Sequence, residues 1–172
     1  LYMFNLKKIN GDLNVKKFKK KIPDIRKIMA KLTNFSCDHI KNQILAGSDI
    51  VQIFDTWAGL LPKQYINEFC IRPNLKIVKF CKKNKIPVIC FPKGLKKNYK
   101  SFVNKVKPDC ISIDYDVNPK WAKLNLKKVC IQCGLNPKML LKSEKKLMLE
   151  LNKYLKVFSG KPYIFNLGHG IM

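Results

Sequence analysis

The sequence predicts an α/β fold built around a parallel sheet. Five short segments rich in Val, Ile and Phe recur along the 172 residues, and Gly, Pro, Asn or Asp bounds each of them. Stretches with helical periodicity separate these segments. The apolar runs show no polar alternation, which is typical of parallel strands that are covered on both faces.

The first elements follow from local signals. Residues 24–46 form a helical pattern that Gly47 closes. The first strand is expected at 49–55. Beyond it, Pro62 suits a first helical turn, and an apolar stripe continues this helix, which Pro73 is expected to kink or divide.

The remaining elements alternate in the same way. For the last helix, Asn136 is the candidate N-cap, Pro137 the first helical residue and Gly160 the stop. The further strands are expected at 87–91, 110–115, 128–132 and 163–166, and the further helices at 97–106, 118–125 and 137–158.

This alternation of five strands with helices implies right-handed crossovers between parallel neighbours. The spacing favours a (β/α)8 TIM barrel over a short open sheet, although five units leave strand edges unpaired on both sides. We therefore expect residues 1–172 to be a single domain, the carboxyl-terminal part of a TIM barrel and a fragment of a longer chain. The basic stretch 7–22 is expected to be a loop insertion or an edge segment.

The formal charge of +24 suggests a polyanion as partner, such as nucleic acid or an acidic membrane surface. Only Arg26 and Arg72 are arginines, however, and the other basic residues are lysines spread along the chain, whereas base readout favours arginine. We favour a solvated lysine-rich surface without specific nucleic-acid binding. The densest cluster, 16–21, is the candidate for non-specific anion binding.

Seven cysteines form no closely spaced framework, and neither a signal peptide nor an apolar run of about 18 residues occurs, so we expect reduced thiols, a cytoplasmic protein and no membrane span. Cys130 and Cys133 form a lone CxxC pair. Zinc would need further ligands, and His39 and His169 are the only histidines. Buried apolar packing is the simpler explanation for these thiols.

Polar residues follow the expected strands at their carboxyl ends, where parallel α/β folds bind ligands. Asp55, Asp114 and Asn136 have a simpler explanation, because short polar side chains often cap helices or bind loop amides. His169 lies between two glycines after a buried strand, which makes core packing a poor explanation for it. The whole set comprises Asp55, Thr56, Asp114, Asp116, Gln132, Asn136, Asn166 and His169.

The chain contains no G-x-S-x-G elbow, no P-loop and no G-x-G-x-x-G, so hydrolase, NTPase and dinucleotide-binding functions lack support. Two segments, 52–59 (QIFDTWAG) and 164–170 (IFNLGHG), resemble signature segments of the uroporphyrinogen decarboxylase family. Three further stretches are similar in order and spacing, namely 39–47, 111–115 and 132–137, the last matching a Gln-Gly-Asn-Leu-Asp-Pro pattern. The resemblance extends from about residue 35 to the end.

The resemblance implies a TIM barrel that works as a homodimer without metal or organic cofactor. Such an enzyme converts the four acetate side chains of uroporphyrinogen III to methyl groups and releases carbon dioxide, giving coproporphyrinogen III. The resemblance places substrate-binding roles on Thr56, His169 and Phe54, all at the mouth of the barrel. A hydroxyl and an imidazole suit this role because both can hydrogen-bond carboxylates.

The sequence also departs from the family pattern. It has no counterpart of the Arg-Gln-Ala-Gly-Arg segment or of the catalytic aspartate, so the catalytic residues are expected upstream of Leu1, and the chain is expected to be inactive alone. One alternative is a zinc-dependent, cobalamin-type methyltransferase of the same superfamily, which would need a histidine at Val88 to complete a His-x-Cys site with Cys90. The other alternative is a basic nucleic-acid-binding module.

Overall fold

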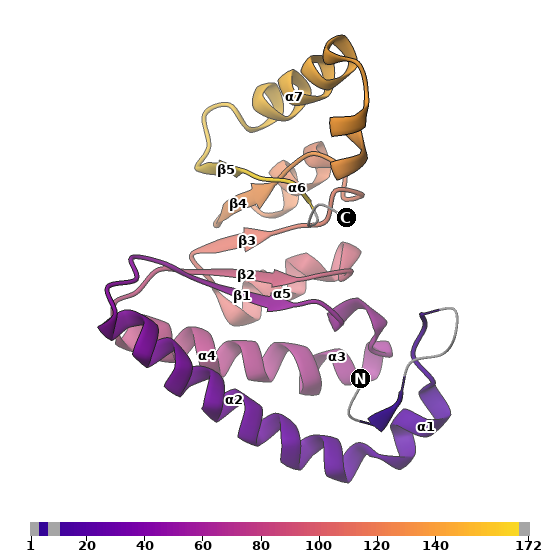
Figure 1. Cartoon of the computed structure of the whole chain (residues 1–172), viewed down its shortest axis with the longest axis vertical. Coiled ribbons are helices and arrows are strands. Elements are labelled where there is room, and N and C mark those ends of the chain that lie inside the picture. The colour runs from indigo at the N-terminus through magenta and orange to yellow at the C-terminus, as the bar shows by residue number, and fades with distance from the viewer. Residues whose placement is uncertain (1–3, 7–10, 169–172) are drawn as a thin grey trace.

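The computed structural model describes residues 4–6 and 11–168. Its centre is a parallel five-stranded sheet in the order β1-β2-β3-β4-β5, so every strand pairs with its neighbour in the sequence (Figure 1). This order, with a helical connection after each of the first four strands, is that of consecutive units of a TIM barrel. The strands are β1 (Val51–Asp55), β2 (Val88–Pro92), β3 (Cys110–Ser112), β4 (Cys130–Cys133) and β5 (Tyr163–Phe165).

All five strands were predicted within a few residues of their observed bounds. The largest difference is the third strand, which was predicted to reach residue 115 but ends at Ser112. Beyond it, the carboxylate of Asp114 accepts hydrogen bonds from the amide of Gly94 and the hydroxyl of Tyr99. These contacts draw the chain out of the ladder and into a loop.

The helical connections also agree with the prediction, with two differences in detail. The helix after β1 is divided by a wide turn that ends just before Pro73, and the region 137–158 consists of two pieces joined near Ser143. The helices are α1 (Val15–Lys20), α2 (Ile22–Leu45), α3 (Lys63–Ile66), α4 (Arg72–Lys83), α5 (Tyr99–Val106), α6 (Pro119–Asn125) and α7 (Glu144–Phe158), with single turns at η2 (Ala58–Leu60), η3 (Asn67–Ile71), η4 (Lys96–Asn98) and η5 (Pro137–Leu141).

The stretch 7–22 is not a loop or edge segment where the structure describes it, because it contains α1. The side chain of Asn14 caps this helix by accepting a hydrogen bond from the amide of Lys17. Phe18 is buried and packs edge-on against Tyr65 and Phe69. This packing stabilises a short lysine-rich helix whose sequence alone favours exposure.

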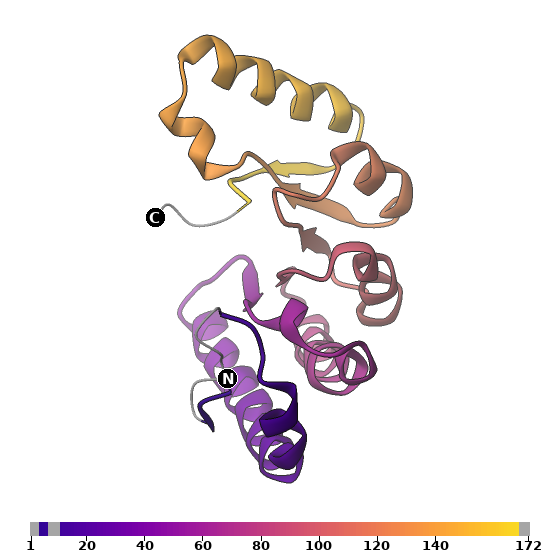
Figure 2. The ribbon, with the colours of Figure 1, turned by 90° about the vertical axis from the view of Figure 1, so that its right-hand side faces the viewer.

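Only one face of the sheet is covered by the helices α4, α5 and α6, which lie together on one side in Figure 2. The main apolar core lies there and includes Val88, Ile111, Phe102 and Ile131, all nearly inaccessible to solvent. The opposite face is open, and Phe54 on it is 67% exposed. The same face is nearly inaccessible at the central strands, where Ser112 and Gln132 are 4% and 3% exposed. The prediction that both faces of the strands are covered is therefore confirmed for β2, β3 and β4, and it is wrong for the outer strands β1 and β5. Among them, no helix is long and apolar enough to cross a membrane.

Candidate functional site

The end of β1 sends consecutive side chains to opposite faces of the sheet. The carboxylate of Asp55 accepts a hydrogen bond of 3.2 Å from Asn74 on α4, so Asp55 points toward the helices. Because side chains alternate along a strand, Phe54 points to the open face. There its ring packs edge-on against Phe91 of β2, with the ring centroids 6.3 Å apart. The signature segment thus offers an aromatic ring, not its carboxylate, to the open face.

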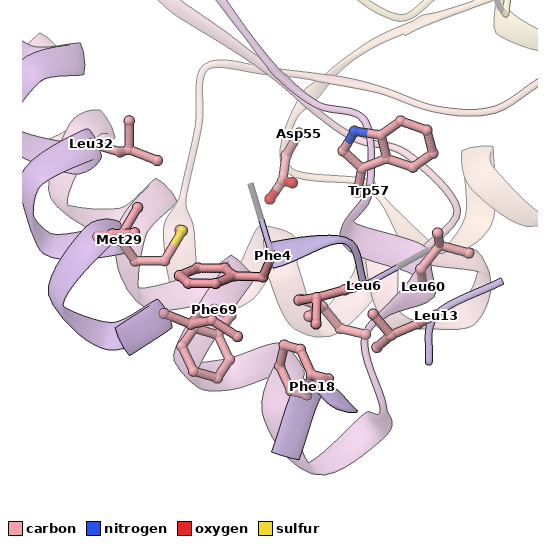
Figure 3. Close-up of a pocket in the computed structure, with 13 residues that line it drawn as sticks. Phe4, Leu6, Leu13, Phe18, Met29, Leu32, Asp55, Trp57, Leu60 and Phe69 are labelled. Atoms are coloured by element: carbon pink, nitrogen blue, oxygen red, sulfur yellow. The ribbon is translucent and has the colours of Figure 1, made fainter. Parts of the chain in front are cut away.

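Asp55 was predicted among the polar residues at the mouth of the barrel. This prediction is wrong, because the carboxylate points toward α4 and belongs to the scaffold. Burial raises the pKa of Asp55, and hydrogen bonds from Cys70 and Asn74 oppose this rise. Figure 3 shows the carboxylate beside Trp57 at an apolar pocket of about 190 Å³. The other lining residues come from the amino-terminal segment, α1, α2 and the connection after β1, among them Phe4, Leu6, Met29 and Leu60.

The open face combines aromatic and neutral polar groups. The register pairs Gln52 with Ile89 and Ser112 with Gln132, which places these side chains on the same face as Phe54. The amide of Gln132 reaches across to the side-chain oxygen of Gln52 at 3.5 Å. Phe54 is exposed on this face and Gln52 is half-buried, so these two can contact a large ring system, whereas Ser112 and Gln132 are buried and only keep the face free of fixed charge.

Close backbone contacts connect the loops at the carboxyl ends of the strands. A Cβ at Gly59 would lie 2.5 Å from the carbonyl oxygen of Gly94, and one at Gly168 would lie 2.6 Å from the amide nitrogen of Tyr115. At Gly134 the corresponding distance to the carbonyl oxygen of Asn166 is only 1.4 Å. Glycine at these positions lets loops from different strands meet at one end of the sheet.

Asp114 and Asn136 hold these loops, as the simpler explanation predicted. Asp114 is 7% exposed and accepts hydrogen bonds of 2.7 Å from the amide of Gly94 and 2.8 Å from the hydroxyl of Tyr99. Burial raises the pKa of Asp114, while both hydrogen bonds oppose the rise. Asn136 caps η5 by accepting a hydrogen bond from the amide of Lys138.

Two supporting residues, Asn74 and Tyr99, were missed by sequence reasoning. Asn74 lies 19 residues from Asp55, and Tyr99 lies 15 residues from Asp114. Each occupies an ordinary position in an amphipathic helix, so no local pattern marks it. Only the packing of each helix against the sheet reveals the partner.

The three residues with expected substrate-binding roles lie at or beyond the ends of β1 and β5. Phe54 is on the open face, and Thr56 follows β1 as an exposed residue. His169 lies outside the described residues. Its neighbour Gly168 is fixed at this end of the sheet, because its amide donates a hydrogen bond of 3.0 Å to the carbonyl of Leu135.

The cysteines give no sign of a metal centre. Cys90 is fully buried, and Val88 stands where a His-x-Cys site would need histidine. The register pairs Cys90 with Ile53 and Ile111, which share the face of Asp55, so its thiol points toward the helices. Within 4–6 and 11–168, no group of three or more His, Cys, Asp or Glu side chains could hold a metal ion.

Comparison with known proteins gives a consistent result. The model of the uroporphyrinogen decarboxylase family matches residues 8–172, a longer match than the signature segments alone indicated. Three proteins named uroporphyrinogen decarboxylase are similar to the chain. The one from Orientia tsutsugamushi strain Boryong is 45% identical and covers 82% of the chain. Those from Rickettsia bellii and Rickettsia africae are 39% and 38% identical and cover 90% and 94% of it. The chain itself spans 42%, 47% and 49% of these relatives, about half of their length.

Proposed function

Because the chain belongs to the uroporphyrinogen decarboxylase family, we propose that it forms the carboxyl-terminal half of a decarboxylase acting on uroporphyrinogen III. The reaction would convert the four acetate side chains to methyl groups and give coproporphyrinogen III. The match over residues 8–172 is the observation that carries this proposal. The neutral, partly aromatic open face supports it, because a tetrapyrrole is a large ring with polar nitrogens.

The chemistry defines what the residues of this chain would do. Loss of carbon dioxide from an acetate leaves an electron pair on the methylene carbon, which a protonated pyrrole can accept. A second proton then completes the methyl group, and the pyrrole releases the first proton, so that one proton is consumed for each carbon dioxide released. The chain would contribute binding and positioning. Phe54 would pack against the ring, while Thr56 and His169 would hydrogen-bond the carboxylates of the substrate.

The cationic clamp and the catalytic aspartate would come from other parts of the full-length enzyme. Arg26 is paired with Glu68, and Arg72 lies at the start of α4, which covers the opposite face of the sheet. Asp55 and Asp114 are held by scaffold contacts. The proposal also includes a cytoplasmic homodimer that needs no metal or organic cofactor.

A reconstitution assay tests this proposal. The 172-residue chain alone should leave uroporphyrinogen unchanged when the products are oxidised and separated by chromatography. Co-expression with the amino-terminal half of the Orientia tsutsugamushi relative should restore the release of carbon dioxide and the formation of coproporphyrinogen. Decarboxylation by the chain alone would contradict the proposed division of labour.

A matched pair of variants identifies the role of the open face in the reconstituted enzyme. Phe54→Ala should lower kcat/KM, because it removes the exposed ring expected to contact the substrate. Phe35→Ala removes a ring that is similarly exposed, at 68%, but lies on α2, and it should have no effect. Equal losses in the two variants would argue against a substrate contact at Phe54.

A further inference from the structure

A lysine-lined groove lies at the amino-terminal ends of the strands, opposite the proposed substrate site. It has a volume of about 810 Å³, within the usual range for ligand pockets. Lys82 comes from the last turn of α4, and Lys107 caps α5. Lys127 and Lys128 precede β4, and Lys161 precedes β5. Four consecutive connections thus contribute cations to one concave surface.

The ammonium groups of this groove make no contact with an acidic side chain of the described residues, although that of Lys161 donates a hydrogen bond of 3.1 Å to the carbonyl of Lys123. Among the residues that the structure describes, none of the five lysines takes part in an ion pair. Asp109 is the one acid among the lining residues, and its carboxylate accepts a hydrogen bond of 3.0 Å from the amide of Val88. The formal charge of the groove is therefore strongly positive.

Helix dipoles offset part of this positive charge but not all of it. The carboxyl ends of α4, α5, α6 and α7 approach this face, and each carries a partial charge of about −0.5. With Asp109, these ends offset about three of the five lysine charges, which leaves a remainder of about two positive charges. A remainder of this size in a concave site attracts a multivalent anion.

The lining of the groove indicates the class of anion. The described residues that line it include neither arginine nor any aromatic side chain, so they lack the groups that read bases or stack on them. Ammonium groups act as point charges on phosphate and need no planar, bidentate partner. Several of them along one groove supply separate point charges for an anion that carries several phosphate groups. We propose that this groove binds a linear oligophosphate of the tripolyphosphate class.

A charge-matched pair of triple variants tests the proposal by calorimetric titration of the full chain with sodium tripolyphosphate. Lys82→Gln/Lys107→Gln/Lys128→Gln removes charges from the groove. Lys16→Gln/Lys17→Gln/Lys19→Gln removes the same number from the exposed surface of α1. The groove variant should weaken binding at least about tenfold, and the α1 variant less than about twofold. Equal weakening would show that the net charge, not the groove, attracts the anion and would overturn the proposal.

Two further measurements keep the test independent of folding defects in a variant. Amide resonances of the unmodified chain at Lys107, Asp109 and 127–130 should shift on titration with tripolyphosphate, while those of α1 should not. Single-stranded DNA should compete weakly, and tighter binding of DNA through the same lysines would replace the oligophosphate with nucleic acid as ligand. Because the groove lies at the other end of the strands, a result that overturns oligophosphate binding would leave the proposed decarboxylase function untouched.

Discussion

Replacing Gly134 with alanine tests whether the close approach of two loops holds the end of β5 in place. A Cβ at this position would lie 1.4 Å from the carbonyl oxygen of Asn166, whereas ordinary contact begins at 3.4 Å. The two backbones must therefore separate by about 2 Å, because neither atom belongs to a flexible side chain. Two hydrogen bonds lie in the path of this movement. The amide of Asn166 donates to Cys133 at 3.1 Å, and that of Gly168 donates to Leu135 at 3.0 Å.

Loss of both hydrogen bonds should lower the free energy of unfolding by about 1–3 kcal/mol. Urea unfolding measures this loss, and hydrogen exchange at the amides of Asn166 and Gly168 locates it. Gly160→Ala is the control, because no atom lies within 4 Å of its Cβ and only the positive φ of 76° is strained. It should cost about 1 kcal/mol and leave both amides protected. A loss below about 0.5 kcal/mol in Gly134→Ala, with unchanged exchange, would refute the reasoning.

Three further predictions concern the loops and the open face. Tyr99→Phe removes a hydrogen bond to a buried carboxylate and should cost about 1.5–3 kcal/mol in urea unfolding at pH 7, whereas an unchanged midpoint would contradict this role. Burial raises the folded-state pKa of Asp114 above its unfolded value, so the folded chain binds more protons between the two values, and stability should fall as pH rises through that window. Asp114→Asn should remove this contribution, and an unaltered pH profile would count against it. Phe54→Ala should change the free energy of unfolding by less than about 1 kcal/mol, because the ring is 67% exposed, and a larger loss would identify a packing role instead.

The sequence predicted those elements whose signals are local. Gly47 follows the helix at Ile22–Leu45, and Asn136 caps a helical turn as expected. The direction of Asp55 could not be predicted in this way, because alternation assigns faces only once the covered face is known. That assignment depends on the packing of α4 against β1, where Asn74 meets the carboxylate. The helix α1 was missed for a similar reason, since its stability comes from Phe18 packing against residues more than forty positions away.

The division of polar groups between the two faces of the sheet bears on the proposed decarboxylase function, because the proposed substrate is anionic. Asp55 and Asp114 point into scaffold contacts, so neither carboxylate is free to repel the carboxylates of a porphyrinogen. Gln52, Gln132 and Phe54 leave the open face without fixed charge. In the proposed enzyme, the formal charge of +24 would attract the substrate from a distance, while Phe54 and the half-buried Gln52 would help to orient it. Because salt screens long-range attraction, kcat/KM of the reconstituted enzyme should decrease with ionic strength, while the effect of Phe54→Ala persists at high salt.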